Sequence, residues 1–128
     1  MIRYWCVSIL IAVALAACGR GGAATLNEPI QLAPGQWASF KAEKLEVQFV
    51  GIDDDSRCPN DVTCVWAGEV VVRLTLRRDS RNKEVSVKET QGLAVDGYTI
   101  SILQVLPPRA SSSPVPPADY RVTLKITR

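Results

Sequence analysis

The sequence predicts an all-β domain, an antiparallel sandwich of about seven strands. Apolar and polar residues alternate with a period of two in several short stretches, as they do along a strand with one buried face. Turn residues separate these stretches, and none of them keeps the 3.6-residue period of an amphipathic helix. A small barrel satisfies the same pattern, but short strands over about 100 residues more often form two packed sheets.

Three of these stretches show the clearest alternation. Each contains a set of apolar residues at every second position, with polar or charged residues between them for most of its length. The apolar positions should face the core and the intervening positions should face water or a second layer. The inward sets are Leu45, Val47 and Phe49; Val70, Val72, Leu74 and Leu76; and Tyr120, Val122, Leu124 and Ile126.

Four weaker strands complete an immunoglobulin-like sandwich, and we place them at residues 30–33, 36–41, 83–89 and 98–106. In the last of these the inward set changes phase from Tyr98, Ile100 and Ile102 to Leu103 and Val105, which predicts a β-bulge or burial on both faces. Residues 107–118 are rich in proline and serine and should form a long loop, because proline cannot pair in a central strand. Turns are expected at Pro34-Gly35, at residues 79–82 and at Asp96-Gly97.

The first residues have the pattern of an export signal. Arg3 is followed by an apolar run at residues 7–17, which at about 11 residues is too short to span a bilayer. The run ends in Leu15-Ala16-Ala17-Cys18 and resembles a bacterial lipoprotein signal. The resemblance implies cleavage before Cys18, a diacylglycerol on its thiol, and room for a further chain such as palmitate on the new amino terminus.

This resemblance divides the chain into a cleaved signal peptide at residues 1–17, a lipidated flexible tether at 18–28, and the β-sandwich at 29–128. It predicts a cell-envelope protein whose membrane contact is the lipid at Cys18. Gly19, and not aspartate, follows that cysteine. In a Gram-negative cell the resemblance to sorted lipoproteins therefore implies the outer membrane, on its periplasmic or its surface side.

Net charge argues against nucleic-acid binding, and the cysteine content predicts one disulfide. The chain has a formal net charge of +2, which is too small to steer it toward nucleic acid. Of its 4 cysteines, Cys6 lies in the signal and Cys18 carries lipid. Cys58 and Cys64 remain in an oxidising compartment and should form a disulfide. That bond closes a loop of about seven residues and contributes about 2 kcal/mol on the chain-entropy model.

The densest motif surrounds this disulfide. Residues 55–69 read DSRCPNDVTCVWAGE. They resemble a motif of small bacterial lipoproteins and secreted proteins in which DSRCP precedes a second cysteine, a tryptophan and a glycine that lead into a strand. The resemblance extends from about Leu45 to Arg128, and it implies a β-rich exported domain without bringing catalytic residues.

Within the motif we expect a covalently closed loop that supports the end of the sandwich and faces a partner. Asp55 should accept N–H bonds from the loop or pair with Arg57, and Trp66 should pack beside the sulfurs. Redox chemistry is disfavoured, because the cysteines lack the Cys-x-x-Cys spacing at a helix start. The candidate partner-binding residues are Pro59, Asn60, Asp61, Val62 and Trp66.

Catalytic, metal and cofactor sites are not expected. The chain contains no histidine, which removes Ser-His and Cys-His pairs, and two bonded cysteines cannot build a zinc site. The aspartates at 53–55 fail the calcium-loop spacing, because Cys58 stands where glycine is required, and we interpret them as a solvated acidic turn. A carboxylate pair at Asp61 and Glu69 leaves a hydrolase as a minor alternative.

We therefore predict a non-enzymatic, lipid-anchored module that binds a protein or an envelope polymer. The alternative is an immunoglobulin-like inhibitor of a protease or another envelope enzyme, with the disulfide loop or the proline-rich loop inserted as an ordered wedge. A basic stripe is a further possibility if Arg73 and Arg77 lie on a strand beside that of Arg121 and Lys125.

Overall fold

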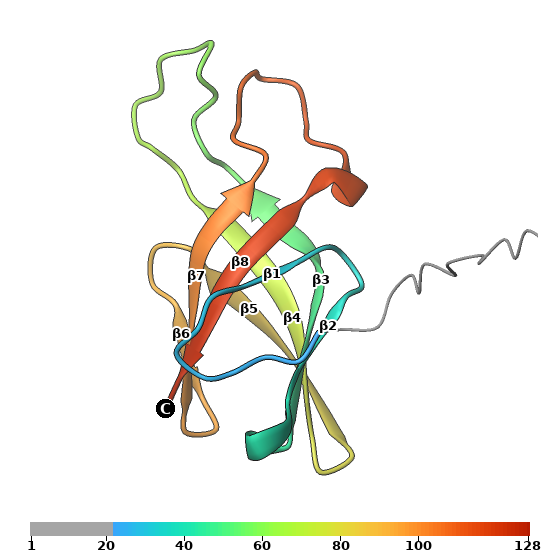
Figure 1. The fold of residues 1–128 in the computed structure, drawn as a ribbon. Helices are drawn as coiled ribbons and strands as arrows, with labels where there is room; N and C mark the ends of the chain where they lie inside the picture. Colours follow the sequence, from blue (N-terminus) through green and yellow to red (C-terminus); the bar gives the residue numbers. More distant parts are fainter. Residues whose placement is uncertain (1–21) are drawn as a thin grey trace, which may run out of the picture.

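A computed structural model describes residues 22–128, which form two antiparallel sheets of four strands (Figure 1). One sheet has the order β1-β8-β7-β6 and the other the order β2-β3-β4-β5. The elements are β1 (Ile30–Leu32), β2 (Trp37–Phe40), η1 (Lys41–Glu43), β3 (Leu45–Asp55), β4 (Val70–Arg78), β5 (Arg81–Lys88), β6 (Leu93–Val95), β7 (Tyr98–Leu106), η2 (Pro117–Asp119) and β8 (Arg121–Thr127).

The predicted sandwich is confirmed, and the two sheets do not close into a barrel. The strand count differs by one, because β6 pairs with β7 through only three residues and shows no clear alternation. The strand that begins at Leu45 is also longer than predicted and continues to Asp55. Asp53, Asp54 and Asp55 therefore belong to a strand and not to the expected acidic turn.

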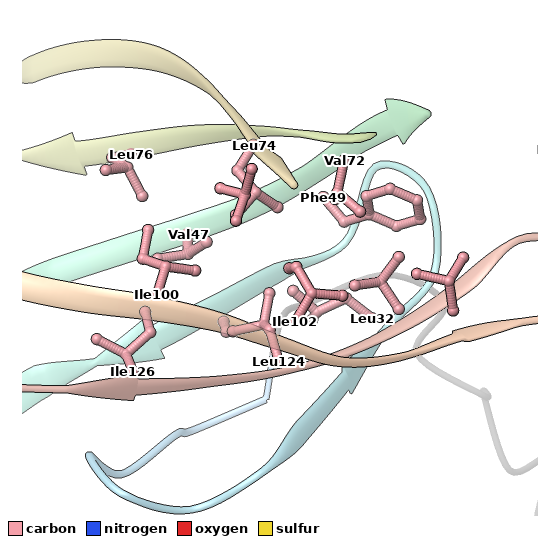
Figure 2. Packing of buried hydrophobic residues seen from close by; sticks show 14 of the residues in the cluster. Leu32, Val47, Phe49, Val72, Leu74, Leu76, Ile100, Ile102, Leu124 and Ile126 are labelled. Atoms are coloured by element: carbon pink, nitrogen blue, oxygen red, sulfur yellow. The ribbon is translucent and has the colours of Figure 1, made fainter. Parts of the chain in front are cut away.

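The core lies between the sheets and is built from the predicted inward sets (Figure 2). One side of the core is formed by four fully buried residues, Val47 and Phe49 of β3 and Val72 and Leu74 of β4. Ile100, Leu124 and Ile126 face them from the other sheet. Branched aliphatic side chains suit this position because they pack well on a pleated surface.

Bulges interrupt the period of two where the strands approach the loops. In β3 the register shifts between Phe49 and Gly51 and again between Ile52 and Asp54. In β7 it shifts between Ile102 and Gln104, which confirms the predicted irregularity. The shift buries Val105 and leaves Leu103 46% exposed, so only one of the two residues expected after the phase change faces the core.

Residues 22–28 lie against the sandwich. Ser39 donates its N–H to the carbonyl of Gly22, and Ala24 donates to the carbonyl of Ser39. Asn27 bonds to Ile126, and Ala24 and Leu26 pack on the core. Residues 22–28, which the sequence assigned to the tether, therefore contact the sandwich through these bonds and side chains. Cys18 and the signal at 1–17 lie outside the described residues.

The connections gather at opposite ends of the sandwich (Figure 1). The 56–69 connection between β3 and β4 and the proline-rich connection between β7 and β8 project from one end, drawn at the top. The β4–β5 and β6–β7 hairpins turn at the other end. Within residues 22–128, no helix has the length and apolar character needed to cross a membrane.

Candidate functional site

The disulfide loop begins as a backbone ladder that extends from β3 and β4. Ser56 donates its N–H to the carbonyl of Glu69 at 2.9 Å, and Cys58 donates to Ala67 at 3.0 Å. The Ser56 hydroxyl also bonds to the Glu69 backbone. Gly68 has φ of +68°, and a Cβ at this position would overlap the Ser56 carbonyl. Glycine is therefore required here for two reasons, the conformation and the close approach.

The predicted bond between Cys58 and Cys64 is present and closes the tip of this ladder. Inside the ring, Val62 donates its N–H to the carbonyl of Pro59 at 3.3 Å, so residues 59–62 form a turn. The covalent bond and the ladder together restrict the loop at both its tip and its base.

The proline-rich loop lies beside the disulfide loop and is bonded to it. Asn60 donates its N–H to the carbonyl of Arg109 at 2.9 Å, and Ser112 donates to the Asp61 carboxylate at 3.3 Å. Sequence reasoning treated these loops as alternative binding surfaces. We call residues 56–69 and 107–118 together the loop platform, because these hydrogen bonds join them and both loops project from the same end of the sandwich (Figure 1).

Asp55 anchors this platform to the sandwich. Its side chain is only 7% exposed and makes a two-point ion pair with Arg57, at 2.8 Å for each bond. The Tyr120 hydroxyl donates to the same carboxylate at 2.8 Å. Arg109 donates to the Asp55 backbone carbonyl at 3.0 Å. The predicted pairing of Asp55 with Arg57 is confirmed, and the carboxylate also recruits β8 and the proline-rich loop.

Arg57 extends the same network in the other direction. Its guanidinium donates to the carbonyl of Val105 at 2.9 Å and to that of Pro107 at 3.1 Å. These carbonyls lie where β7 ends and the proline-rich loop begins. One arginine side chain therefore ties the start of the disulfide loop to the start of its neighbour, and the bidentate geometry to Asp55 fixes its orientation.

The network alters the titration of its members. Burial raises the pKa of Asp55, but hydrogen bonds from Arg57 and Tyr120 and the Arg57 charge outweigh it, so the pKa is lowered. The hydrogen bond to Asp55 raises the pKa of Arg57 despite its burial. Burial and the bond to Asp55 raise the pKa of Tyr120 to about 12. Asp55 therefore stays ionised and Tyr120 stays protonated near neutral pH, which preserves the network.

The outer surface of the platform exposes apolar side chains. Val62 is 47% exposed, Trp66 69% and Val65 104%. Most of the Trp66 side chain is therefore open to solvent, although we expected it to pack beside the sulfurs. An ordered loop that leaves a tryptophan and two valines in water has the composition of an interface centre.

Of the predicted binding residues, Asn60, Asp61, Val62 and Trp66 are exposed on this loop, and Pro59 is half-buried. Sequence reasoning missed Val65 as a surface residue, and Arg109 and Tyr120 as supports. Val65 stands between a disulfide cysteine and Trp66, in the segment that leads into β4. No local pattern marks Arg109 or Tyr120, because their partners are more than 50 positions away.

The acidic residues near the platform have partners. Asp53 pairs with Arg73 and accepts a bond from Ser86, and the Ser86 bond contributes most to lowering its pKa despite burial. Glu69 accepts a bond from Thr90 and pairs with Lys88 at 3.2 Å, and these two contacts lower its pKa. Between residues 22 and 128, no three Cys, Asp or Glu side chains are grouped as a metal site would need.

The basic stripe is not formed. Arg73 and Arg77 lie on β4, while Arg121 and Lys125 lie on β8 in the other sheet. Arg77 also pairs with Glu46 at 3.3 Å and covers the Trp37 ring at 4.1 Å. The expectation required neighbouring strands, and the sheet order contradicts it.

Comparison of the chain with protein-family models, with curated proteins and with solved structures gives no match.

Proposed function

We propose that this chain is a non-enzymatic binding module of the bacterial cell envelope, anchored by lipid at Cys18, whose loop platform docks on a protein. The observation that carries the proposal is the exposure of Val62, Val65 and Trp66 on a loop held by a disulfide and a backbone ladder. Ordering before contact lowers the entropy cost of binding, and a tryptophan surrounded by smaller groups is a common energetic centre of interfaces.

The charge of the platform favours a protein over an anionic lipid surface. No lysine or arginine lies between Arg57 and Arg73, and Asp61 is the charged residue inside the disulfide ring. Arg57 and Arg109, the basic residues of the platform, are directed toward Asp55 and are at most 17% exposed. Surfaces that bind anionic membranes present basic side chains, and this one presents valine, tryptophan and backbone polar groups.

Site-specific crosslinking in the native envelope tests the proposal. A photoreactive amino acid at Val65 should yield a protease-sensitive adduct of one protein, whereas the same group at Leu103, which is 46% exposed on β7, should not. Trp66→Ala should lower the yield of that adduct by tenfold or more, since losing such a centre costs about 2 kcal/mol. A protease-resistant polymer adduct, or equal yields from both positions, contradicts a protein partner.

The anchor is tested separately. Cys18→Ser should abolish incorporation of labelled fatty acid and release the protein from membranes, because stable attachment needs more than one acyl chain. In a Gram-negative host the wild-type chain should fractionate with the outer membrane. Fatty-acid incorporation into Cys18→Ser would rule out this residue as the attachment site.

Inhibition of an enzyme is a special case of the same docking. If the captured protein is a hydrolase, addition of the module should lower its turnover, and Trp66→Ala should relieve the inhibition. If turnover is unchanged when the enzyme is saturated with the module, the module binds the enzyme without inhibiting it, and the inhibitor function is ruled out.

A further inference from the structure

A cavity of about 790 Å³ lies at the end of the sandwich opposite the loop platform. Its lining residues come from β3, β4 and β5 of one sheet and from β6 and β7 of the other. The cavity is therefore an opening between the sheets, where the β4–β5 and β6–β7 hairpins turn (Figure 1). Its volume lies within the range of small-molecule sites, about 300 to 1,000 Å³.

The inner wall of the cavity is apolar. Leu45, Leu76, Tyr98 and Ile100 line it and are at most 6% exposed, and Val95 adds a half-buried side chain. The hydrophobic core of the domain thus continues into the cavity. Such a wall favours the hydrocarbon part of a ligand, at about 25 cal/mol for each Å² removed from water.

The mouth of the cavity is basic. Arg78, Arg81 and Lys83 line it, with Asp79 and Asp96 as the acidic residues. Lys83 and Asp96 form an ion pair at 3.8 Å, and both side chains are more than half exposed, so the pair is weak. Among residues 22–128, no carboxylate lies within ion-pair distance of Arg78 or Arg81.

The two arginines stand directly opposite each other. Arg78 of β4 is paired in register with Arg81 of β5, across the two-residue turn of Asp79 and Ser80. Like charges at opposed positions of an antiparallel pair destabilise it. An anion between the two guanidinium groups would convert this repulsion into two charge-assisted contacts.

Tyr98 supplies a second observation at the same place. It is 4% exposed, and its hydroxyl is buried without a hydrogen-bond partner within the described chain. Arg78 and Arg128 lie over its ring, at 5.7 Å and 5.6 Å from the centroid. A buried hydroxyl without a hydrogen-bond partner destabilises the fold, because it has lost its bonds to water. A ligand oxygen can accept a bond from this hydroxyl once a side chain that lines the cavity changes rotamer.

We infer that this cavity binds a small amphipathic anion, a carboxylate with a medium-length hydrocarbon body. The hydrocarbon lies on Leu45, Leu76 and Ile100, the carboxylate lies between Arg78 and Arg81, and an oxygen of the ligand accepts a bond from Tyr98. The site is separate from the loop platform and does not depend on the function proposed for it.

Photoaffinity labelling of the full chain, in the form its host produces, tests this site. The probe is octanoate with a diazirine on its chain. Labelled peptides should come from residues 76–83 and 93–100, and octanoate should compete with the probe. Octanol and octylamine share the hydrocarbon body without the negative charge and should compete at least tenfold less well. Labelling confined to residues 58–67, or equal competition by octanol, overturns the inference.

Variants assign the contacts. Arg78→Gln with Arg81→Gln should lower the affinity for octanoate by tenfold or more, and Arg81→Gln alone by about tenfold. The matched control, Arg73→Gln with Arg121→Gln, removes two arginines that do not line the cavity and should leave the affinity unchanged. Tyr98→Phe keeps the ring and should lower affinity severalfold. If the double variant and its control bind octanoate with equal affinity, Arg78 and Arg81 do not contact the ligand.

Discussion

The carboxylate of Asp55 and the hydroxyl of Tyr120 are 2.8 Å apart, although 65 positions separate them in the sequence. This contact joins the end of β3 to the residue that precedes β8, and so links the two sheets beneath the loop platform. Because Arg57 binds the same carboxylate, the network ties the conformation of the platform to the packing of the sandwich.

Removal of the Asp55 charge should destabilise the domain. Asp55→Asn leaves the buried Arg57 without its counter-charge, and breaking such a pair costs about 3 kcal/mol. Urea unfolding followed by tryptophan fluorescence measures this. The control is Asp53→Asn, which removes the aspartate of a more exposed arginine pair and should cost under about 1 kcal/mol. Equal losses would show that the Asp55 network contributes no more than a surface pair.

Acid should weaken the protein through the same residue. Since the folded-state pKa of Asp55 is lowered, its contribution is complete above the unfolded value of 3.8. It is lost as the pH falls below 3.8 through the folded-state pKa. Titration of stability between pH 5 and pH 2 should therefore be steeper for the wild type than for Asp55→Asn, and parallel curves would contradict this.

Tyr120 should make the stability of the protein fall at alkaline pH. Its pKa is raised from 10.0 to about 12, so the unfolded chain releases this proton first and stability falls as the pH rises from 10 to 12. The loss amounts to about 2 kcal/mol. Tyr120→Phe should be less stable than the wild type at neutral pH, and the two curves should converge toward pH 12, because the wild type loses the Tyr120 contribution over this range. A constant difference would exclude the raised pKa.

Gly68 should tolerate no side chain. Gly68→Ala combines a positive φ with overlap between the new Cβ and the Ser56 carbonyl. Gly35→Ala, at φ of +85° with open space around it, carries only the conformational cost of about 1 kcal/mol. We expect Gly68→Ala to lose about 2 kcal/mol more than this control. Hydrogen exchange at the Ser56 and Cys58 amides should increase in Gly68→Ala alone.

The disulfide should stabilise the domain without defining its fold. Changing Cys58 and Cys64 to alanine should lower the free energy of unfolding by about 2 kcal/mol, with the far-ultraviolet circular dichroism preserved. Asn60→Ala and Val62→Ala should change it by under about 0.5 kcal/mol, since both side chains are exposed. Two free thiols in the protein isolated from its host under non-reducing conditions would contradict a structural role.

Much of the sandwich could be predicted because burial of one strand face leaves a local signal. The predicted inward residues are buried in β4, from Val70 to Leu76, and in β8 with the preceding Tyr120, up to Ile126. The extension of β3 to Asp55 was missed, because its bulges break the period of two that identified the first half. The short β6 was missed because three residues are too few to display a period.

The site was predictable in part. The cysteine pair and the Asp55–Arg57 contact follow from residues close in sequence. The joining of the two loops depends on Asn60 with Arg109 and on Arg57 with Val105, and such distant contacts follow only from strand order. Trp66 was expected beside the sulfurs and among the partner-binding residues, and its 69% exposure on the loop depends on the fold of the whole segment and not on a local sequence pattern.

The pairing of β1 with β8 has a consequence for the order in which the chain can fold. The strands β2 to β5 are consecutive neighbours, so their sheet can form as the chain emerges from a ribosome. The other sheet must wait, because Ile30 at the start of the fold pairs with Leu124 near its end. Until β8 emerges, the apolar face of the first sheet lacks Val122, Leu124 and Ile126 as its cover, and a chain truncated before residue 121 would be a substrate for chaperones and proteases.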